Sequence, residues 1–357
     1  MQPLIFDVHL DLAMNALEWN RDLRLPLSEI RAGEAGRTDL KGRGCGVVSF
    51  PEMRRGNIGV CVATQIAGCM KRRGAAAGWN SPEQAWAETQ GQLAWYRVLE
   101  EQGTLRQIRK AEMLDAHLQE WVENRENAPI GYVLSLEGAD SLVNLNYLER
   151  AWESGLRAVG PAHYGVGRYA LGHDQDGPLS GPGRELLREM DRFGMILDTT
   201  HLSERTFWDA LEVFEGPVWA SHSNCRALVN DRRQFSDEQI RALIGRGAVI
   251  GGALDAWMLM PGWVKGKTTP EEAGVRLEHL VDHLDHICQL AGNARHAGIG
   301  SDLDGGFGRD QCPEDLESIA DLQKLDELLL ARGFSQEDVE GILSGNFLRF
   351  LHEAWRG

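Results

Sequence analysis

The chain has 357 residues, of which 43% are hydrophobic and 25% are charged, as in an ordinary globular protein. Its formal net charge of −16 argues against a broad surface for nucleic acid or for an anionic membrane, because like charges repel. None of the six cysteines forms a Cys-x-x-Cys pair, and a chain of this length can build a core without disulfides. We therefore expect a reduced, cytoplasmic compartment, with no nucleic-acid partner and no membrane partner.

The first strand is predicted over residues 4–12, where an apolar run passes into alternating polar and apolar residues. The few residues before it lack the basic region and long apolar core of a signal peptide, and no apolar run approaches the ~20 residues of a membrane span. His9 and Asp11 lie two apart in this strand and share one face. An imidazole and a carboxylate so placed are two adjacent ligands for a divalent metal, although His-x-Asp alone is common by chance.

A polar connection rich in Gly and Arg follows at residues 21–46, and further short apolar runs are predicted as strands. These runs cover residues 58–64, 130–136, 155–160, 194–198, 217–220, 247–252 and 298–300. Helix signals lie between them. Ser81 followed by Pro82 starts a helix that runs to about residue 101, and another helix covers 110–124. The remaining helices are predicted over 182–193, 203–214, from a capping box at Ser236, from Thr269 to about 291, and over 347–357.

Short apolar strands that alternate with helices predict parallel βα units, and their number of about eight closes a (β/α)8 barrel. In that fold the active site lies where strands end and loops begin, and the polar residues of this chain fall there. An open doubly wound sheet is the alternative, but it would place the chemistry at one switch point rather than after nearly every strand. No linker of disordered composition divides the chain, so we expect a single α/β domain over residues 1–357.

Polar residues with metal-binding or catalytic potential follow the predicted strands in chain order. They are His9, Asp11, Glu137, His163, His201, His222, Arg233 and Asp302. Each has an ordinary alternative: a histidine after a strand is more often a loop residue, Glu137 can cap a turn, and Arg233 can form a solvated pair with Arg232. Asp302 or Asp304 can be turn residues of an Asp-Gly loop. Their joint position at one end of a barrel favours a functional site.

Two metals at a barrel mouth need a bridging anion. No lysine follows a strand-like run in the middle of the chain, so a carboxylated lysine is not available, whereas Glu137 is. With Glu137 as the bridge, His9 and Asp11 would hold one metal, and His201 and His222 the other. Mixed imidazole and carboxylate ligands favour zinc. We therefore expect two Zn²⁺ per chain, bridged by Glu137 and by a shared water or hydroxide whose pKa the metals lower.

A series of short motifs keeps one order from the first strand to the last helix. They are Asp7-Val8-His9-Leu10-Asp11, Glu137-Gly138, the His163 segment, Asp198-Thr199-Thr200-His201, Phe207-Trp208-Asp209, Ser221-His222-Ser223-Asn224, Arg232-Arg233, Gly251-Gly252, Gly300-Ser301-Asp302-Leu303-Asp304-Gly305 and Gly345-Asn346-Phe347. In this the sequence resembles the membrane (renal) dipeptidase family, the M19 metallopeptidases of the amidohydrolase superfamily. The resemblance implies a binuclear zinc barrel that hydrolyses dipeptides, often with a D-residue at the C-terminal position, and it implies a homodimer.

The resemblance also implies roles for the remaining residues. His163 matches the histidine that contacts the scissile carbonyl oxygen, where it could stabilise an oxyanion. Arg233 matches the arginine that binds the substrate carboxylate, although its neighbour Arg232 is an alternative. Asp302 matches the aspartate of the last strand, which would handle the water proton or the substrate amine, and Asp304 is expected to lie behind it. The chain departs from the family at Pro161-Ala162, where a hydroxyl residue usually precedes the histidine.

Three histidines elsewhere are spaced as on one helix, at His279, His283 and His286. An apolar stripe occupies the same helix, so we expect these histidines on a largely solvated side and not as metal ligands. Residues 174–177 begin like a calcium loop but lack the later ligands, which predicts an ordinary polar loop. Trp257 and Trp263 could line a pocket or an interface.

These observations favour a zinc-dependent dipeptidase that acts through a binuclear-metal-activated water. A second hypothesis is another amidohydrolase chemistry on the same barrel, such as a deaminase or a lactonase. A deaminase is expected to add a catalytic glutamate after a late strand, and the sequence has none in the usual His-Ala-Gly-Glu context. A third hypothesis is a metal-free binding protein on an inactive barrel, which predicts the loss of ligands, whereas the full set is present.

Overall fold

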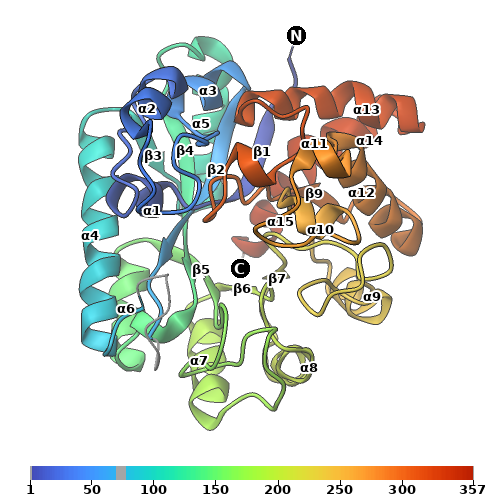
Figure 1. The fold of residues 1–357 in the computed structure, drawn as a ribbon. Coiled ribbons are helices and arrows are strands. Elements are labelled where there is room, and N and C mark those ends of the chain that lie inside the picture. The colour runs from blue at the N-terminus through green and yellow to red at the C-terminus, as the bar shows by residue number, and fades with distance from the viewer. Residues whose placement is uncertain (1, 70–77, 357) are drawn as a thin grey trace.

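The computed structural model describes residues 2–69 and 78–356, and its strands form the predicted (β/α)8 barrel (Figure 1). All strand pairs are parallel, and the sheet has the order β7-β6-β5-β4-β2-β1-β9-β8. The barrel strands are β1 (Ile5–Leu10), β2 (Ile58–Ile66), β4 (Ile130–Glu137), β5 (Leu156–Gly160), β6 (Ile196–Asp198), β7 (Val218–Trp219), β8 (Ile250–Gly252) and β9 (Ala297–Ile299).

The barrel is nearly closed between β7 and β8, where Ala220 and Ile250 form a single parallel bridge. A further strand, β3 (Leu105–Gln107), pairs with the start of β4 and lies off the barrel path. The sequence did not predict β3, because three residues with an arginine at the centre carry no periodic signal.

Helices surround the barrel and lie between successive strands (Figure 1). They are α1 (Leu12–Leu17), α2 (Leu27–Glu34), α3 (Phe50–Arg55), α4 (Pro82–Glu101), α5 (Ala111–Asn124), α6 (Leu145–Glu153), α7 (Gly181–Arg192), α8 (Glu204–Val213), α9 (Asp237–Gly245), α10 (Ala256–Leu259), α11 (Pro270–Ala273), α12 (Leu277–Ala291), α13 (Lys324–Arg332), α14 (Gln336–Glu340) and α15 (Asn346–Ala354). Short 3₁₀ turns occupy Ala139–Ser141, Arg309–Gln311 and Ile319–Gln323, and a π-helical turn occupies Gly341–Gly345.

The predicted helix starts are confirmed where a capping residue marks them. The Ser81 hydroxyl accepts the backbone N–H of Gln84 at the start of α4, and Ser236 forms a complete capping box with Gln239 at the start of α9. The side-chain oxygens thereby satisfy backbone donors that the first helical turn leaves free.

One helix prediction is wrong, and several helices were not predicted. The helix that begins at Thr269 does not continue to about residue 291, because Gly274 adopts a left-handed conformation with φ of +65° and ends α11 after Ala273. A second helix, α12, then begins at Leu277. The helices that the sequence did not predict are α1, α2, α3, α6, α10, α13 and α14.

Two packing layers support the barrel. Inside it, alternate strand residues such as Phe6, Val62 and Trp219 form a buried cluster, and Phe347 of α15 packs edge-on against Phe6 and Trp219. Outside it, the opposite faces of the strands pack on the surrounding helices. At Gly300 the strand ends approach so closely that a Cβ atom would lie 1.7 Å from the Ser221 carbonyl oxygen. Only glycine permits this close approach of the strand ends.

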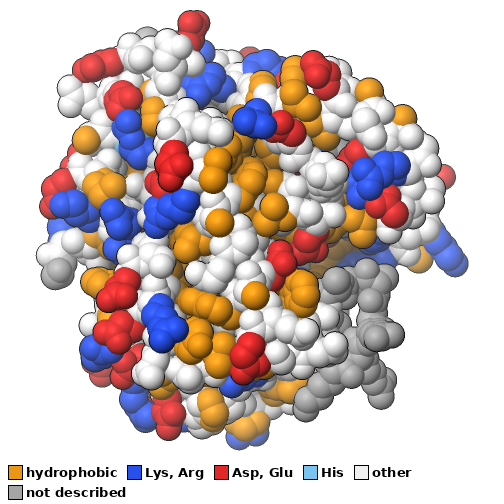
Figure 2. Space-filling model, turned by 90° about the vertical axis from the view of Figure 1, so that its left-hand side faces the viewer, with side chains coloured by type: hydrophobic (Ala, Val, Ile, Leu, Met, Phe, Trp, Pro, Cys, Tyr) orange, Lys and Arg blue, Asp and Glu red, His pale blue; other side chains and the backbone are white. Residues whose placement is uncertain are grey.

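Positive and negative side chains are interspersed with hydrophobic ones on the face that carries α4 (Figure 2). Within the described residues, none of the helices combines the length and the apolar composition that crossing a membrane requires.

Candidate metal centre

The predicted metal ligands converge at one end of the barrel. His9 lies near the end of β1, Glu137 is the last residue of β4, and His201 and His222 follow β6 and β7. The structure contains three groups of side chains whose possible ligand atoms lie within 4.8 Å of one another: His9–Glu137–His222, Glu137–His163–His201 and His9–Asp11–Asp302. All residues predicted as ligands therefore share one site, although they are far apart in the sequence.

Glu137 occupies the centre of this cluster. Its Oε2 atom lies 3.6 Å from Nε2 of His9, while its Oε1 atom lies 3.1 Å from Nε2 of His201 and 3.4 Å from Nε2 of His222. The two oxygens of one carboxylate thus face two different sets of imidazoles. Both oxygens are therefore within reach of any cation that the surrounding imidazoles hold.

The first strand and the last strand complete the side of the cluster around His9. Its Nε2 atom lies 3.9 Å from Oδ2 of Asp11 and 3.6 Å from Oδ1 of Asp302. Asp11 also accepts the hydroxyl of Thr64 on β2, which fixes its carboxylate. Asp302 follows β9 with a left-handed backbone, φ +59°, a strained conformation for a residue with a side chain.

His163 differs from the other imidazoles because its side chain is 37% exposed. Its Nε2 atom lies 4.0 Å from Oε1 of Glu137, and the neighbouring Tyr164 ring packs edge-on against it. His163 therefore lies at the border between the buried cluster and the mouth of the barrel, where a substrate can reach it.

Because the carboxyl groups of the cluster are buried, their charged forms are unfavourable when no cation is present. Burial first, and then the Asp11 carboxylate, hold the pKa values of Glu137 and Asp302 well above their ordinary values, and Arg233 opposes both shifts. Burial also raises the pKa of Asp11 to about 6, against the hydrogen bond from Thr64. A cation among these groups would reverse the shifts, because it stabilises the charged carboxylates.

The imidazoles shift in the opposite direction. Burial and the Arg233 charge lower the pKa of His9 to about 3, and they lower that of the partly exposed His163 as well. The pKa values of His201 and His222 lie well below the ordinary value, again chiefly because of burial. All four rings are therefore neutral at pH 7, the state in which an imidazole can offer a lone pair to a metal.

The residues present fit a metal centre. Nε2 of His9 is buried and has no hydrogen-bond partner among the described residues, although carboxylate oxygens surround it. A buried polar atom without a partner is costly in a folded protein. Nitrogen and oxygen ligands in this mixture suit zinc. The structure thus offers a donor set for cations rather than a network of satisfied hydrogen bonds.

The two arginines that the sequence left as alternatives differ in their surroundings. Arg233 is buried, and its guanidinium donates to the carbonyl oxygen of His222 at 2.8 Å and to the Ser223 hydroxyl at 3.3 Å. Arg232 is exposed and lines a surface pocket together with His173. Only Arg233 lies against the backbone of a predicted ligand.

Several residues that support the cluster were not predicted. Asp7 accepts the N–H and hydroxyl of Ser301, which joins β1 to the residues after β9. Asp198 accepts the N–H groups of Thr200 and Ser221 and so joins the ends of β6 and β7. Both residues lie within the quoted motifs, but their role depends on which strands are neighbours, and that was visible only in the fold.

His173 was also missed. It is buried in the loop after β5, and its Nδ1 atom lies 3.2 Å from Nδ1 of His201. His173 does not directly follow a strand, so a search for polar residues at strand ends does not identify it. Its neighbour Asp174, part of the predicted polar loop, accepts the N–H of Gly165 and is exposed.

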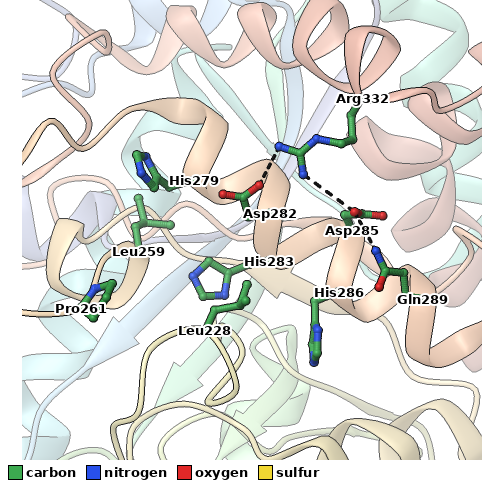
Figure 3. A pocket seen from close by; sticks show the side chains of 10 residues that line it. All are labelled: Leu228, Leu259, Pro261, His279, Asp282, His283, Asp285, His286, Gln289 and Arg332. Carbon is green, nitrogen blue, oxygen red and sulfur yellow. Dashed lines mark hydrogen bonds and ion pairs between the residues drawn. The ribbon is translucent and has the colours of Figure 1, made fainter.

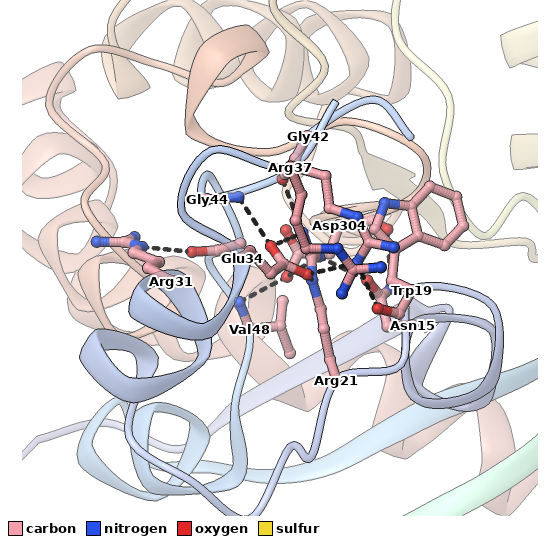
Figure 4. A network of polar contacts seen from close by, with 12 residues as sticks. Asn15, Trp19, Arg21, Arg31, Glu34, Arg37, Gly42, Gly44, Val48 and Asp304 are labelled. Atoms are coloured by element: carbon pink, nitrogen blue, oxygen red, sulfur yellow. Dashed lines mark hydrogen bonds and ion pairs between the residues drawn. The ribbon is translucent and has the colours of Figure 1, made fainter. Parts of the chain in front are cut away.

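Asp304 belongs to a network of polar contacts that includes Arg21 and Val48 (Figure 4). Its carboxylate accepts the backbone N–H groups of Val47 and Val48 and lies 3.6 Å from the guanidinium of Arg21, which also pairs with Glu34. Burial raises the pKa of Asp304 to about 6, and Arg21 opposes the shift. This buried network therefore links the connection at residues 21–46 to the loop that carries Asp302.

Figure 3 shows the three histidines of α12 together with Leu228, Leu259 and Arg332. His279, His283 and His286 line a surface pocket, but none of the groups of possible metal ligands among the described residues contains them. The prediction that all three face solvent is wrong for His283, which is 1% exposed and accepts the N–H of Cys225. His286 pairs with Asp237 at 2.8 Å.

The tryptophans after β8 form part of a small buried cluster. Trp257 and Trp263 pack together with Ala253 and Met258, and the indole N–H of Trp257 donates to Asp255 at 2.6 Å. They stabilise the loop that leaves the barrel at this strand.

Comparisons with known proteins identify a matching family and several relatives of this chain. A sequence model of the family described as membrane dipeptidase (peptidase family M19) matches residues 2–356. Dipeptidase tcpJ of Claviceps purpurea is 33% identical over 229 residues, which are 62% of this chain and 50% of that protein. An uncharacterized protein in the pqqA 5′ region of Klebsiella pneumoniae is 28% identical over 241 residues, which are 65% of this chain and 85% of that protein. The match thus spans only half the length of the Claviceps dipeptidase.

Two solved structures have the same fold. The crystal structure of the dipeptidase AC, a metallopeptidase of family M19, superimposes with a TM-score of 0.77 and 22% identity, covering 100% of both chains. A metallopeptidase from Rhodobacter sphaeroides, solved with a phosphinate mimic of the dipeptide L-Ala-D-Ala, has a TM-score of 0.75 and 21% identity, covering 99% of this chain and 100% of that one.

Proposed function

This chain belongs to the membrane dipeptidase family, peptidase family M19, and we propose that it is a zinc-dependent dipeptidase that cleaves the peptide bond of L,L- or L,D-dipeptides. The observation that carries the proposal is the position of Glu137, whose two carboxylate oxygens face His9 on one side and His201 and His222 on the other. The Rhodobacter metallopeptidase was solved with a mimic of L-Ala-D-Ala, which supports an L,D-dipeptide as a substrate.

We assign His9 and Asp11 to one metal ion and His201 and His222 to the other, with Glu137 as the shared ligand. Two bound zinc ions would lower the pKa of a shared water and polarise the carbonyl of the peptide bond. A catalytic site of this kind needs neutral imidazoles and charged carboxylates, and the pKa of each ligand imidazole already lies below 6.5.

Two residues would handle the proton and the developing charge. Asp302, whose Oδ1 atom lies 3.6 Å from Nε2 of His9, would take a proton from the attacking water and return it to the leaving amine as the C–N bond breaks. His163 is neutral at pH 7 and partly exposed, so it can donate an N–H to the carbonyl oxygen as negative charge develops there.

Arg233 would bind the C-terminal carboxylate of the dipeptide. A planar guanidinium suits a carboxylate, and its burial beside His222 keeps the charge close to the scissile bond. A site that requires the free carboxylate next to the cleaved bond selects dipeptides over longer peptides, because a longer chain has no carboxylate at that place.

The test is hydrolysis by the purified chain after metal removal and zinc reloading. We expect release of amino acids from L,L- and L,D-dipeptides, and no ammonia from nucleobases and no ring opening of lactones. Failure to cleave any dipeptide while zinc is bound would overturn the proposal. Ammonia release or lactone hydrolysis instead would favour another amidohydrolase reaction on this barrel.

Three further features stay predictions: one metallo-dependent hydrolase domain over residues 1–357, a homodimer, and a cytoplasmic location. Light scattering of the purified chain tests the dimer, and a single cooperative unfolding transition tests the single domain.

A further inference from the structure

The imidazole of His201 makes contacts on both of its nitrogens. Nε2 faces the cluster, 3.1 Å from Oε1 of Glu137 and 3.0 Å from Nε2 of His222. Nδ1 faces away from it, 3.2 Å from Nδ1 of His173. His201 and His173 are 5% and 7% exposed, so water does not readily replace either contact.

The backbone holds this pair together. Gly172 and Leu202 form an antiparallel bridge, and the N–H of Ser203 donates to the carbonyl oxygen of Leu171 at 2.9 Å. The loop after β5 and the turn after β6 are therefore joined at the residues next to His173 and His201. A side chain at position 172 could not be accommodated, because its Cβ would lie 2.0 Å from the His163 carbonyl oxygen.

If His201 binds metal, only one arrangement of hydrogens on the two neutral rings is possible. A ligand nitrogen must offer its lone pair, so Nε2 of His201 carries no hydrogen and Nδ1 carries the only one. That N–H points at Nδ1 of His173, which must then be an acceptor and hold its own hydrogen on Nε2. Two neutral rings meet these requirements, and the reverse arrangement would place a hydrogen on the nitrogen that faces Glu137.

We propose that His173 is a positioning residue that fixes His201 as the Nδ1–H tautomer and aims its Nε2 atom at the metal site. The inference rests on the proposed function, because it assumes that His201 binds metal. His173 itself is not a ligand, since it belongs to none of the groups of possible metal ligands among the described residues. His222 has a different partner, the Ser221 hydroxyl at 2.8 Å, which can donate or accept and so imposes no tautomer.

His201 needs this support because its backbone is left-handed, with φ of +69°. A residue with a side chain is strained in this region and persists there only when its surroundings hold it. The ring of Tyr164 also packs against both histidines, with centroids 4.6 Å from His173 and 5.3 Å from His201. Packing alone can restrict the ring plane, but only an acceptor at Nδ1 of His173 selects the tautomer.

Two substitutions separate the acceptor from the packing. His173→Asn keeps a polar acceptor at the position of Nδ1, and His173→Leu keeps much of the volume without any acceptor. Zinc is titrated into the metal-free chain in competition with a chelating indicator. We expect His173→Leu to weaken one of the two sites by roughly 10- to 100-fold, and His173→Asn to bind both ions nearly as well as the unsubstituted chain.

Long-range ¹⁵N–¹H correlation spectra of the unsubstituted, zinc-loaded chain give a readout that needs no variant. We expect the signals of His201 to show an Nδ1–H ring and those of His173 to show an Nε2–H ring. The inference is overturned if His173→Leu binds both ions with unchanged affinity, if both variants lose affinity equally, or if His173 carries its hydrogen on Nδ1. If the unsubstituted chain binds no zinc, the proposed function fails instead.

Discussion

Oε1 of Glu137 lies 3.1 Å from Nε2 of His201, although the two residues come from different strands of the barrel. The other oxygen of the same carboxylate faces His9 across 3.6 Å. One side chain therefore contacts imidazoles in both halves of the candidate metal centre.

Glu137→Gln should abolish activity and weaken zinc binding, because the amide keeps the volume but removes the bridging charge. Without its metal the site loses several kcal/mol of transition-state stabilisation, so kcat/KM should fall by roughly 10³-fold or more. Activity assays and zinc analysis of the dialysed protein measure both effects. The exposed Glu149→Gln on α6 is the matched control and should keep full activity and zinc content. A Glu137→Gln chain with normal zinc content would contradict the bridging role.

Asp302→Asn should lower kcat while zinc stays bound. Removal of a general acid or base typically costs about 10²- to 10⁴-fold in rate. Because Asp302 acts on the proton in our account and is not assigned as a metal ligand, KM and zinc content should change little. Steady-state kinetics and metal analysis of the same preparation check the prediction. A variant that loses zinc together with its activity would make Asp302 a ligand instead.

Arg233→Met should weaken the recognition of the substrate carboxylate. A hydrogen bond to a charged group contributes about 1.5–3 kcal/mol, which predicts a loss of roughly 10- to 100-fold in kcat/KM for a dipeptide. The unsubstituted chain should prefer a dipeptide over the corresponding dipeptide amide, and Arg233→Met should lose this preference. Arg232→Met carries the same change at an exposed neighbour and should keep the preference. If Arg232→Met loses it instead, the two arginines exchange roles.

The buried His283 should make the stability of the chain depend on pH in a defined window. Burial lowers its pKa from 6.5 to about 4, so between these values the unfolded chain binds a proton that the folded chain does not. Above pH 6.5 the neutral His283 therefore contributes its full share, roughly 3 kcal/mol, to the free energy of unfolding. This contribution is lost as the pH falls to about 4.

Urea unfolding of the unsubstituted chain and of His283→Asn, at several pH values, measures this contribution. Asn does not titrate and can still accept the N–H of Cys225. The stability difference between the two chains should therefore shrink in acid. His279→Asn, on the more accessible side of the same helix, is the control and should not remove the dependence. If the unfolding free energies of His283→Asn and of the unsubstituted chain change with pH in parallel, His283 does not cause the pH dependence.

The barrel was predictable because its strands are short apolar runs and its polar residues follow them. Glu137 and His201 could be assigned to one site from their place after strands, since parallel strands end at the same rim. The contact between His173 and His201 could not, because it depends on a bridge between two irregular loops. Periodicity gives no information about such a contact.

Other differences have equally local causes. The break at Gly274 depends on one residue in a left-handed conformation, within a segment whose apolar pattern continues on both sides. The burial of His283 depends on Cys225, which reaches it from a distant loop. In both cases a single tertiary or backbone feature overrides the helical pattern.

The central claim is that Glu137 bridges two metal ions held by His9, Asp11, His201 and His222. Anomalous diffraction at the zinc absorption edge, from a crystal of the zinc-loaded chain, tests it most directly. We predict two peaks about 3.5–4 Å apart, one on each side of the Glu137 carboxylate. Absence of a peak at this carboxylate, or zinc bound only elsewhere on the molecule, would contradict the account.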